Sequence, residues 1–184
     1  MSSHTSPTAL PTQPQQSSPH STDASCVLPP GYHSVTPYLI VNGTVAAMDF
    51  YRRAFGASEV MRLDGPHGKI WHAEIQIGNA RVMLADEHPE LGFVSPQTLG
   101  GAGVSLLVYV ADVDAVFAQA IEAGAVQLRA VQNQFYGDRS GTLRDPFGHV
   151  WSIATHIEDL STEEICARSR ELLARRCKKA AEKS

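Results

Sequence analysis

Two side chains capable of acid–base or metal chemistry lie close together in the first half of the chain. His72 and Glu74 alternate with apolar residues in a strand-like stretch, and Gln76 follows at the same interval. Alternate residues of a β-strand point to one face of its sheet, so the imidazole and the carboxylate are expected side by side. Such a pair suits three roles: it can ligate a divalent metal, line the polar wall of a ligand cavity, or face solvent while the other side of the strand packs on a helix. The alternation favours the last two roles over metal ligation.

A second group with chemical potential lies in the second half. Arg139 follows Tyr136 and Asp138 at the start of another strand-like stretch. A guanidinium in this place is suited to hold a carboxylate or phosphate in a bidentate pair. A structural ion pair between neighbouring charges explains the same residues equally well. The candidate pairs are Asp138 with Arg139 and Asp145 with Arg144.

The remaining histidines and aromatic residues give weaker signals. Single histidines in turns and loops usually have structural or exposed roles, and this applies to His67, His88, His149 and His156. Aromatic surface of the kind that lines pockets for planar ligands is supplied by Tyr38, Trp71, Phe135 and Trp151. Core packing accounts for at least half of these four aromatic residues.

The elements that would position these side chains occur twice along the chain. In the first half, a strand precedes a helix that Gly56 ends, and three strands follow. In the second half, a strand precedes a helix capped by Asp112 and ended by Gly124, and three strands follow again. The expected strands are 37–41, 57–63, 70–77 and 80–85 in the first half, and 104–110, 125–131, 138–144 and 149–155 in the second.

The two halves have nearly the same spacing. Val41 and Ala57 are 16 residues apart, and Val110 and Ala125 are 15 apart, so the halves superimpose with a one-residue slip. Such self-similarity is typical of a duplicated unit. The sequence therefore predicts an α+β domain of two tandem βαβββ modules.

Three segments with different compositions divide the chain. Residues 1–30 contain seven Ser, four Thr, six Pro and three Gln, which predicts a disordered tail over residues 1–32. The domain is expected at 33–157, with modules at about 35–88 and 102–157 joined through a flexible glycine-rich linker at 100–103. Ser161 and Glu164 then form a capping box, which predicts a C-terminal helix and a basic tail within 158–184.

Charge and composition narrow the range of partners and locations. The formal net charge is −4 and the pI is about 6.0, so no general attraction to nucleic acid is expected. No Lys or Arg precedes Arg52, and the longest apolar run, 106–111, is far shorter than a membrane span. The three cysteines form no C-x-x-C motif. A cytoplasmic protein with a small-molecule partner and no membrane contact fits these features.

Four stretches of the chain resemble one family. The sequences PYLIV (37–41), FYRRAFGA (50–57), YGDR (136–139) and DPFGHVW (145–151) are similar to the PhnB-like branch of the vicinal oxygen chelate superfamily, which includes glyoxalases, bleomycin resistance proteins and dioxygenases. The resemblance extends over nearly the whole expected domain. It implies that the two modules form a curved mixed sheet, made of two half-sheets that close around a cavity, and that the protein is a homodimer.

The resemblance also implies where a metal would be bound. Metal-dependent members of this superfamily hold the ion with one residue in the first and one in the last strand of each module. In this chain those positions fall near Thr36, Leu84, Val104 and Ser152, which supply no imidazole, carboxylate or thiolate. We therefore expect neither the usual metal centre nor another cofactor. A divalent metal at shifted positions, namely His72, Glu74 and His149, is the alternative.

The residues and the resemblance together define an expected ligand cavity between the modules. Its expected lining consists of Thr36, Tyr38, His72, Glu74, Leu84, Val104, Tyr136, Arg139 and Ser152. The leading interpretation is a protein that binds a small organic molecule there, either to sequester it or to convert it without a metal. The alternative is a metal-dependent lyase or dioxygenase with a rearranged site. A third hypothesis is a dimerisation module whose terminal segments carry the function. No catalytic residue is assigned by the sequence.

Overall fold

The computed structural model describes residues 28–181 of the 184-residue chain. Residues 1–27, which include Cys26 and most of the expected tail (1–32), and residues 182–184 lie outside the described part. From Gly31 onward the chain forms one compact unit. Among residues 28–181, no helix is long and apolar enough to cross a membrane.

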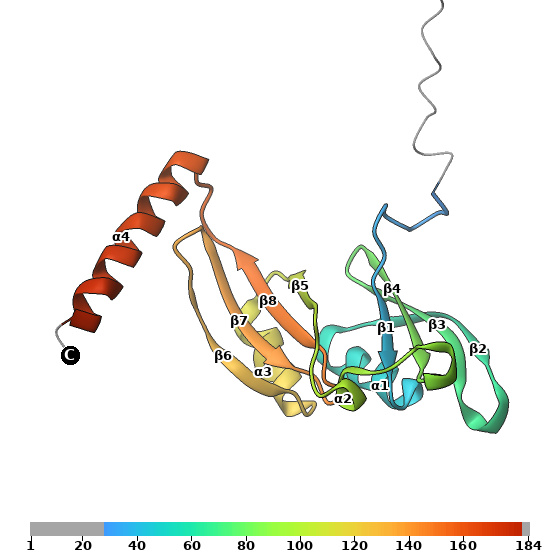
Figure 1. The fold of residues 1–184 in the computed structure, drawn as a ribbon. Coiled ribbons are helices and arrows are strands. Elements are labelled where there is room, and N and C mark those ends of the chain that lie inside the picture. Colours follow the sequence, from blue (N-terminus) through green and yellow to red (C-terminus); the bar gives the residue numbers. More distant parts are fainter. Residues whose placement is uncertain (1–27, 182–184) are drawn as a thin grey trace, which may run out of the picture. The chain divides into compact units, whose positions relative to one another are not determined.

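Two consecutive modules, each a strand, a helix and three strands, make up the fold (Figure 1). The first contains β1 (Tyr38–Val41), α1 (Thr44–Phe55), β2 (Ser58–Asp64), β3 (Ile70–Ile77) and β4 (Ala80–Asp86). The second contains β5 (Ser105–Tyr109), α3 (Val113–Glu122), β6 (Val126–Asn133), β7 (Asp138–Arg144) and β8 (Val150–His156). The prediction of an α+β fold with two tandem βαβββ modules is confirmed.

The connections contain short helices, and a long helix follows the second module. Two 3-10 helices, η2 (Pro66–Gly68) and η3 (Pro89–Leu91), and the short α2 (Pro96–Leu99) lie between strands. Gly100 ends α2 with a φ of 78°, so the glycine-rich stretch expected as a flexible linker begins as a helix cap. The C-terminal helix α4 (Thr162–Ala181) takes up most of the expected 158–184 segment and includes most of its basic residues.

The strands form two separate four-stranded sheets rather than one continuous sheet. Their orders are β1-β4-β3-β2 and β5-β8-β7-β6. In each sheet the first strand runs parallel to the last, and the remaining neighbours are antiparallel. The two modules therefore share one topology, as a duplicated unit requires.

Local sequence signals set the ends of the helices. Gly56 ends α1 with a φ of 66°, a left-handed conformation that glycine adopts without the steric cost of a Cβ atom. Asp112 caps α3 by accepting a hydrogen bond of 3.0 Å from the backbone of Ala115. At α4, Ser161 Oγ accepts from the backbone N–H of Glu164 at 3.2 Å, and Glu164 Oε2 accepts from the N–H of Ser161 at 2.8 Å. This confirms the capping box.

One hydrophobic core joins the two modules. Helices α1 and α3 pack against each other, and buried residues of both sheets belong to the same cluster. Trp151 of β8 is only 3% exposed, and its ring centroid lies 4.9 Å from that of Phe55 in α1. The side of each sheet that faces a helix is thus filled. The opposite side of each sheet, called here its open face, carries the exposed side chains.

Candidate ligand-binding site

The strand register assigns the predicted residues to faces of the first sheet. Glu74 of β3 lies opposite Met83 of β4, and Met83 is in turn in register with Tyr38 of β1. Directly paired residues of neighbouring strands share a face, so Tyr38, Glu74 and also His72 belong to the N-terminal open face. Their neighbours Ala73 and Ile75 are buried in the core on the other side.

Three side chains on the N-terminal open face form a continuous hydrogen-bonded chain. The hydroxyl of Tyr38 lies 3.0 Å from Nδ1 of His72, and Nε2 of His72 lies 3.2 Å from Oε1 of Glu74. Burial increases along this chain, since Tyr38 is 45% exposed and Glu74 only 7%. The pair that the alternation of residues 72 and 74 predicts therefore has a third member from a different strand.

Glu74 is held in its ionised form by its surroundings. The hydroxyl of Tyr32 beside its carboxylate lowers the pKa of Glu74 most, and His72 and Arg81 act in the same direction against the effect of burial. The phenol of Tyr38 behaves differently, because burial raises the pKa of its hydroxyl. At neutral pH the chain thus contains a carboxylate at one end and a protonated phenol at the other.

A cavity of about 360 Å³ adjoins the N-terminal open face. It lies where β1, β5 and the segment between the modules meet. Tyr38 and Ile40 of β1 line it, with Leu99, Val104 and His149. A volume of this size and a mainly apolar lining are typical of sites for small organic molecules.

The C-terminal open face has a hollow of its own. Its volume is about 650 Å³, and its lining is more polar than that of the first cavity. Tyr136 and Ser152, both expected in the ligand cavity, lie here, and Ser152 Oγ is 3.4 Å from Thr142 Oγ1. The other lining residues include Leu107, Arg129, Gln132, Gln134, Phe135 and Ser140.

Within one chain the expected cavity residues are divided between these places. Tyr38, His72 and Glu74 lie on the N-terminal open face, and Val104 lies in the adjoining cavity. Thr36 precedes β1 and donates to the backbone carbonyl of His33 at 3.5 Å. Tyr136 and Ser152 line the hollow on the C-terminal open face.

Leu84 does not line a cavity, contrary to the expectation from the overlay of this sequence on the metal-ligand positions of the family. It is fully buried in the hydrophobic core and lies opposite Leu39 and Ala73, which face α1. A shift of one residue along a strand transfers a side chain to the other face, and the overlay was wrong by that amount here. The open-face residues of β4 around it are Met83 and Ala85.

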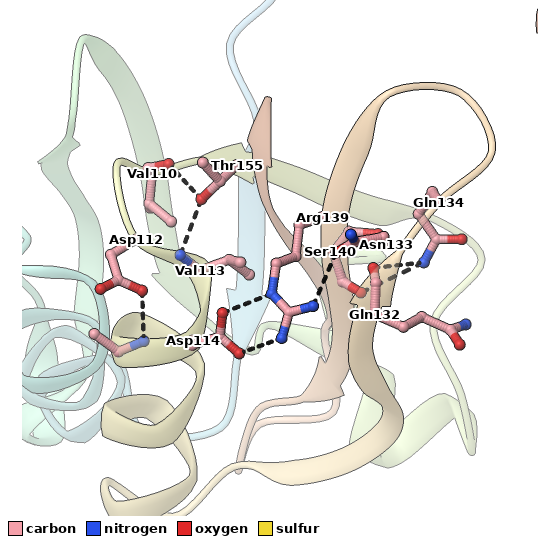
Figure 2. A network of polar contacts seen from close by, with 11 residues as sticks. Val110, Asp112, Val113, Asp114, Gln132, Asn133, Gln134, Arg139, Ser140 and Thr155 are labelled. Carbon is pink, nitrogen blue, oxygen red and sulfur yellow. Dashed lines mark hydrogen bonds and ion pairs between the residues drawn. The ribbon is translucent and has the colours of Figure 1, made fainter. Parts of the chain in front are cut away.

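Arg139 points to the helix side of its sheet and not to a cavity (Figure 2). Its Nε and Nη2 donate to Oδ2 and Oδ1 of Asp114 in α3, both at 2.7 Å, and Nη1 donates to Asn133 Oδ1 at 2.9 Å. The structural ion pair is thus formed, but with a carboxylate that was not among the expected partners. Asp114 already occupies the bidentate position that a ligand carboxylate or phosphate would need.

The other singled-out side chains lie outside both hollows or at their edges. His67 is the one non-glycine residue with positive φ (60°) among residues 28–181, in η2. Trp71 is half-exposed, and its ring centroid lies 5.4 Å from that of His88. The remaining histidine, His156, belongs to a cluster that sequence reasoning missed: Asp138 accepts from the Tyr109 hydroxyl at 2.8 Å and lies 2.8 Å from His156 Nδ1.

No residue set resembling a metal site occurs in the described part of the chain. Among residues 28–181, no group of three or more His, Cys, Asp or Glu side chains is arranged to hold an ion. His149, proposed as a ligand beside His72 and Glu74, instead has its Nε2 3.1 Å from the carbonyl oxygen of Ile40. The open-face residues of β4 and β8 near the family's ligand positions, Met83 and Ser152, are not the imidazole, carboxylate or thiolate donors that such ions require.

Comparison with known proteins agrees with this architecture of paired βαβββ modules. The family model of the Glyoxalase/Bleomycin resistance protein/Dioxygenase superfamily matches residues 31–153. The chain belongs to this superfamily. An uncharacterized protein of Mycobacterium tuberculosis is 40% identical over 137 residues, which cover 73% of this chain and 81% of that protein.

Solved structures with the same fold come from distant organisms. The crystal structure of TioX from Micromonospora sp. ML1 is 25% identical with a TM-score of 0.53, and the match covers 70% of this chain and all of that one (100%). The structure of an Arabidopsis thaliana gene product is 28% identical with a TM-score of 0.54, covering 67% of this chain and 98% of that one. These matches include the modules but not the whole chain.

Proposed function

We propose that the protein binds a small organic molecule, without a resident metal, in a cavity formed by its open sheet faces. The observation that carries this proposal is the N-terminal open face, where exposed aromatic and aliphatic side chains surround one ordered polar chain. The apolar members are Tyr38, Met61 and Leu63, which are 45%, 37% and 53% exposed. Apolar walls with a few fixed polar groups are what small-molecule sites require.

A second copy of the chain would complete this cavity. The C-terminal open face also carries exposed apolar side chains, Leu107 at 55% and Tyr109 at 58%. Large apolar residues that a monomer leaves uncovered commonly mark a contact surface. In a two-fold dimer, the N-terminal open face of one copy would face the C-terminal open face of the other, and symmetry would create two equal cavities. Tyr38 and His72 would then lie opposite Ser152 and Tyr136 of the partner.

The residues present favour binding or metal-independent conversion over metal-dependent chemistry. The family description names resistance proteins alongside glyoxalases and dioxygenases. The last two classes depend on donors that polarise an oxygen-bearing substrate through an ion. The described residues offer the pair His72 and Glu74 but no third donor beside it. A binding role needs only the apolar walls and the polar anchors described above.

Two measurements test the proposal. Aromatic drugs and small carbonyl compounds are titrated into the protein by calorimetry, and the oligomeric state is measured by analytical ultracentrifugation. Leu107→Glu should weaken both dimer formation and ligand binding, because it places a charge on the C-terminal open face. Leu91→Glu is the matched control: Leu91 of η3 is 59% exposed, like Leu107, but belongs to no strand and lines neither the first cavity nor the hollow on the C-terminal open face.

The outcomes separate the parts of the proposal. Equal effects of the two variants would refute the role of the open faces. Absence of binding across a broad panel, together with one equivalent of bound metal, would refute metal-independent binding and favour the lyase or dioxygenase alternative.

A further inference from the structure

We infer that Tyr38 accepts a proton from the bound molecule, with His72 as the group that receives the phenolic proton and Glu74 as the group that orients His72. This inference rests on the proposed function, because it assigns a chemical role to one wall of the same cavity. This role would make the protein a metal-independent acid–base catalyst rather than only a binding protein.

The distances and the ionised state of Glu74 fix the direction of the hydrogen bonds. An ionised carboxylate can only accept, so Nε2 of His72, 3.2 Å from Glu74 Oε1, carries the hydrogen of that bond. The neutral imidazole then has its lone pair on Nδ1, which lies 3.0 Å from the Tyr38 hydroxyl. Tyr38 therefore donates its proton to His72. The order carboxylate, imidazole, hydroxyl is the one that activates hydroxyl nucleophiles and bases in general.

Tyr38 is also the member of the chain that a ligand can reach. It is 45% exposed and lines the cavity of about 360 Å³, whereas the side chains of His72 and Glu74 are 21% and 10% exposed. Because its own proton points to His72, the lone pairs of its oxygen are free to accept a hydrogen bond from the cavity. Burial raises the pKa of Tyr38, so its side chain is a neutral phenol at neutral pH. A neutral phenol can accept the proton of the ligand only if it passes its own proton to His72 in the same step.

The proton transfer that follows is balanced within the protein and its ligand. A ligand with an acidic hydrogen, either an O–H or a C–H beside a carbonyl group, gives that hydrogen to Oη of Tyr38. The original phenolic hydrogen moves to Nδ1 of His72 as the ligand bond breaks, and the electron pair remains on the ligand. The result is a ligand anion and an imidazolium that is stabilised by the adjacent carboxylate of Glu74. Enolisable carbonyl compounds and phenols are the ligand classes that this site would take.

Reactivity of Tyr38 with a small arylsulfonyl fluoride tests the relay without knowledge of the natural ligand. In this reaction the phenolic oxygen bonds to sulfur, fluoride leaves, and the phenolic proton passes to a base. Tyr109 is an internal control for structural change: it lies on the C-terminal open face, which would face Tyr38 of the other copy in the proposed dimer, and its hydroxyl donates to a carboxylate, Asp138, instead of an imidazole. Labelling at each tyrosine is followed by peptide mass spectrometry over time.

The expected result is a decrease of about 100-fold or more in the rate of Tyr38 labelling in His72→Gln, in line with the usual contribution of a general base. Glu74→Gln should lower the rate by a smaller factor, and Tyr109 should react at the same rate in all three proteins. Equal labelling of Tyr38 in wild type and His72→Gln would overturn the inference. Parallel loss at Tyr38 and Tyr109 would also overturn it, because it would indicate a structural role for His72.

A spectroscopic measurement provides a second, independent check. Nitrogen-15 NMR of the folded protein should show His72 as the Nε2–H tautomer, and an Nδ1–H tautomer would overturn the inference because Tyr38 would then accept instead of donate. Neither measurement requires ligand binding. Tyr38→Phe should lose the labelling while still binding apolar ligands, so failure of the relay and failure of the binding proposal give different results.

Discussion

The hydroxyl of Tyr51 in α1 donates a hydrogen bond of 2.7 Å to Oδ2 of Asp145, 94 residues further along the chain and in the other module. Both residues are buried, with 0% and 3% exposure. Asp145 also accepts from Nε1 of Trp151 and from the backbone N–H groups of Phe147 and His149, each at 2.9 Å. One carboxylate thus orders the turn before β8 and fastens that turn to the helix of the first module.

Removing this carboxylate should strongly destabilise the fold. Asp145→Ala leaves four donors, three of them buried, without an acceptor, and we expect a loss of at least about 3 kcal/mol in the free energy of unfolding. Tyr51→Phe removes one hydrogen bond to a charged acceptor and should cost about 2 kcal/mol. Urea unfolding followed by circular dichroism measures both. Asp114→Ala, which breaks the solvent-exposed pair with Arg139, is the control and should cost no more than about 1 kcal/mol. A midpoint for Asp145→Ala equal to that of this control would contradict the assignment.

Gly141 should be intolerant of a side chain. A Cβ atom at this position would lie 2.7 Å from Cε2 of Phe117 in α3 and 2.8 Å from Cγ2 of Val131 in β6. Gly141→Ala should therefore lower the free energy of unfolding by about 1–3 kcal/mol through overpacking. At Gly101 a Cβ would meet nothing within 4 Å, so Gly101→Ala should be neutral or slightly stabilising. Thermal unfolding of both variants provides the comparison, and equal midpoints would refute the close contact.

The repeat of the fold was predictable because the residues that begin and end its helices act locally. Gly56 and the cap Asp112 each act within one helix turn, so the order strand, helix and three strands follows from neighbouring residues. The pairing of His72 with Glu74 was likewise predictable, since it depends only on alternation along one strand. Tyr38 joins them only through the order β1-β4-β3, which nothing near residue 38 specifies.

The predictions for Leu84 and Arg139 were wrong because the position of each side chain depends on more than the local sequence. In β4 the sequence around Leu84 is apolar on both sides, so alternation does not indicate which face is buried, and a one-residue slip in the overlay changed its face. For Arg139 the partner is Asp114, 25 residues away on α3, and only the packing of that helix on β7 brings the two charges together. Contacts that depend on tertiary packing are not encoded in a local pattern.

Glu74 should make stability depend on pH in the acid range. Its pKa is lowered in the folded protein, mainly by the Tyr32 hydroxyl, relative to an ordinary value of 4.5. A carboxyl group with a lowered folded pKa contributes stability that is fully present above its unfolded pKa and is lost as the pH falls through the folded value. We expect Glu74→Gln to be less stable than wild type at pH 7 and the difference to shrink as the pH falls below about 4.5. Urea unfolding of both proteins across this pH range measures the difference in stability. A difference that stays constant at all pH values would show that the ionisation of Glu74 is not its cause.

Purified protein should contain far less than one equivalent of zinc, nickel, manganese or iron per chain after dialysis. The physical reason is the donor set, because in residues 28–181 no third His, Cys, Asp or Glu joins His72 and Glu74. Inductively coupled plasma mass spectrometry before and after incubation with each ion gives the stoichiometry. If one equivalent of metal is retained, the His72→Ala variant locates it: loss of the metal would place the ion on the N-terminal open face and overturn both the metal-independent proposal and the Tyr38 relay. Retention in that variant would place the ion elsewhere, and the prediction of a metal-poor protein would still be wrong.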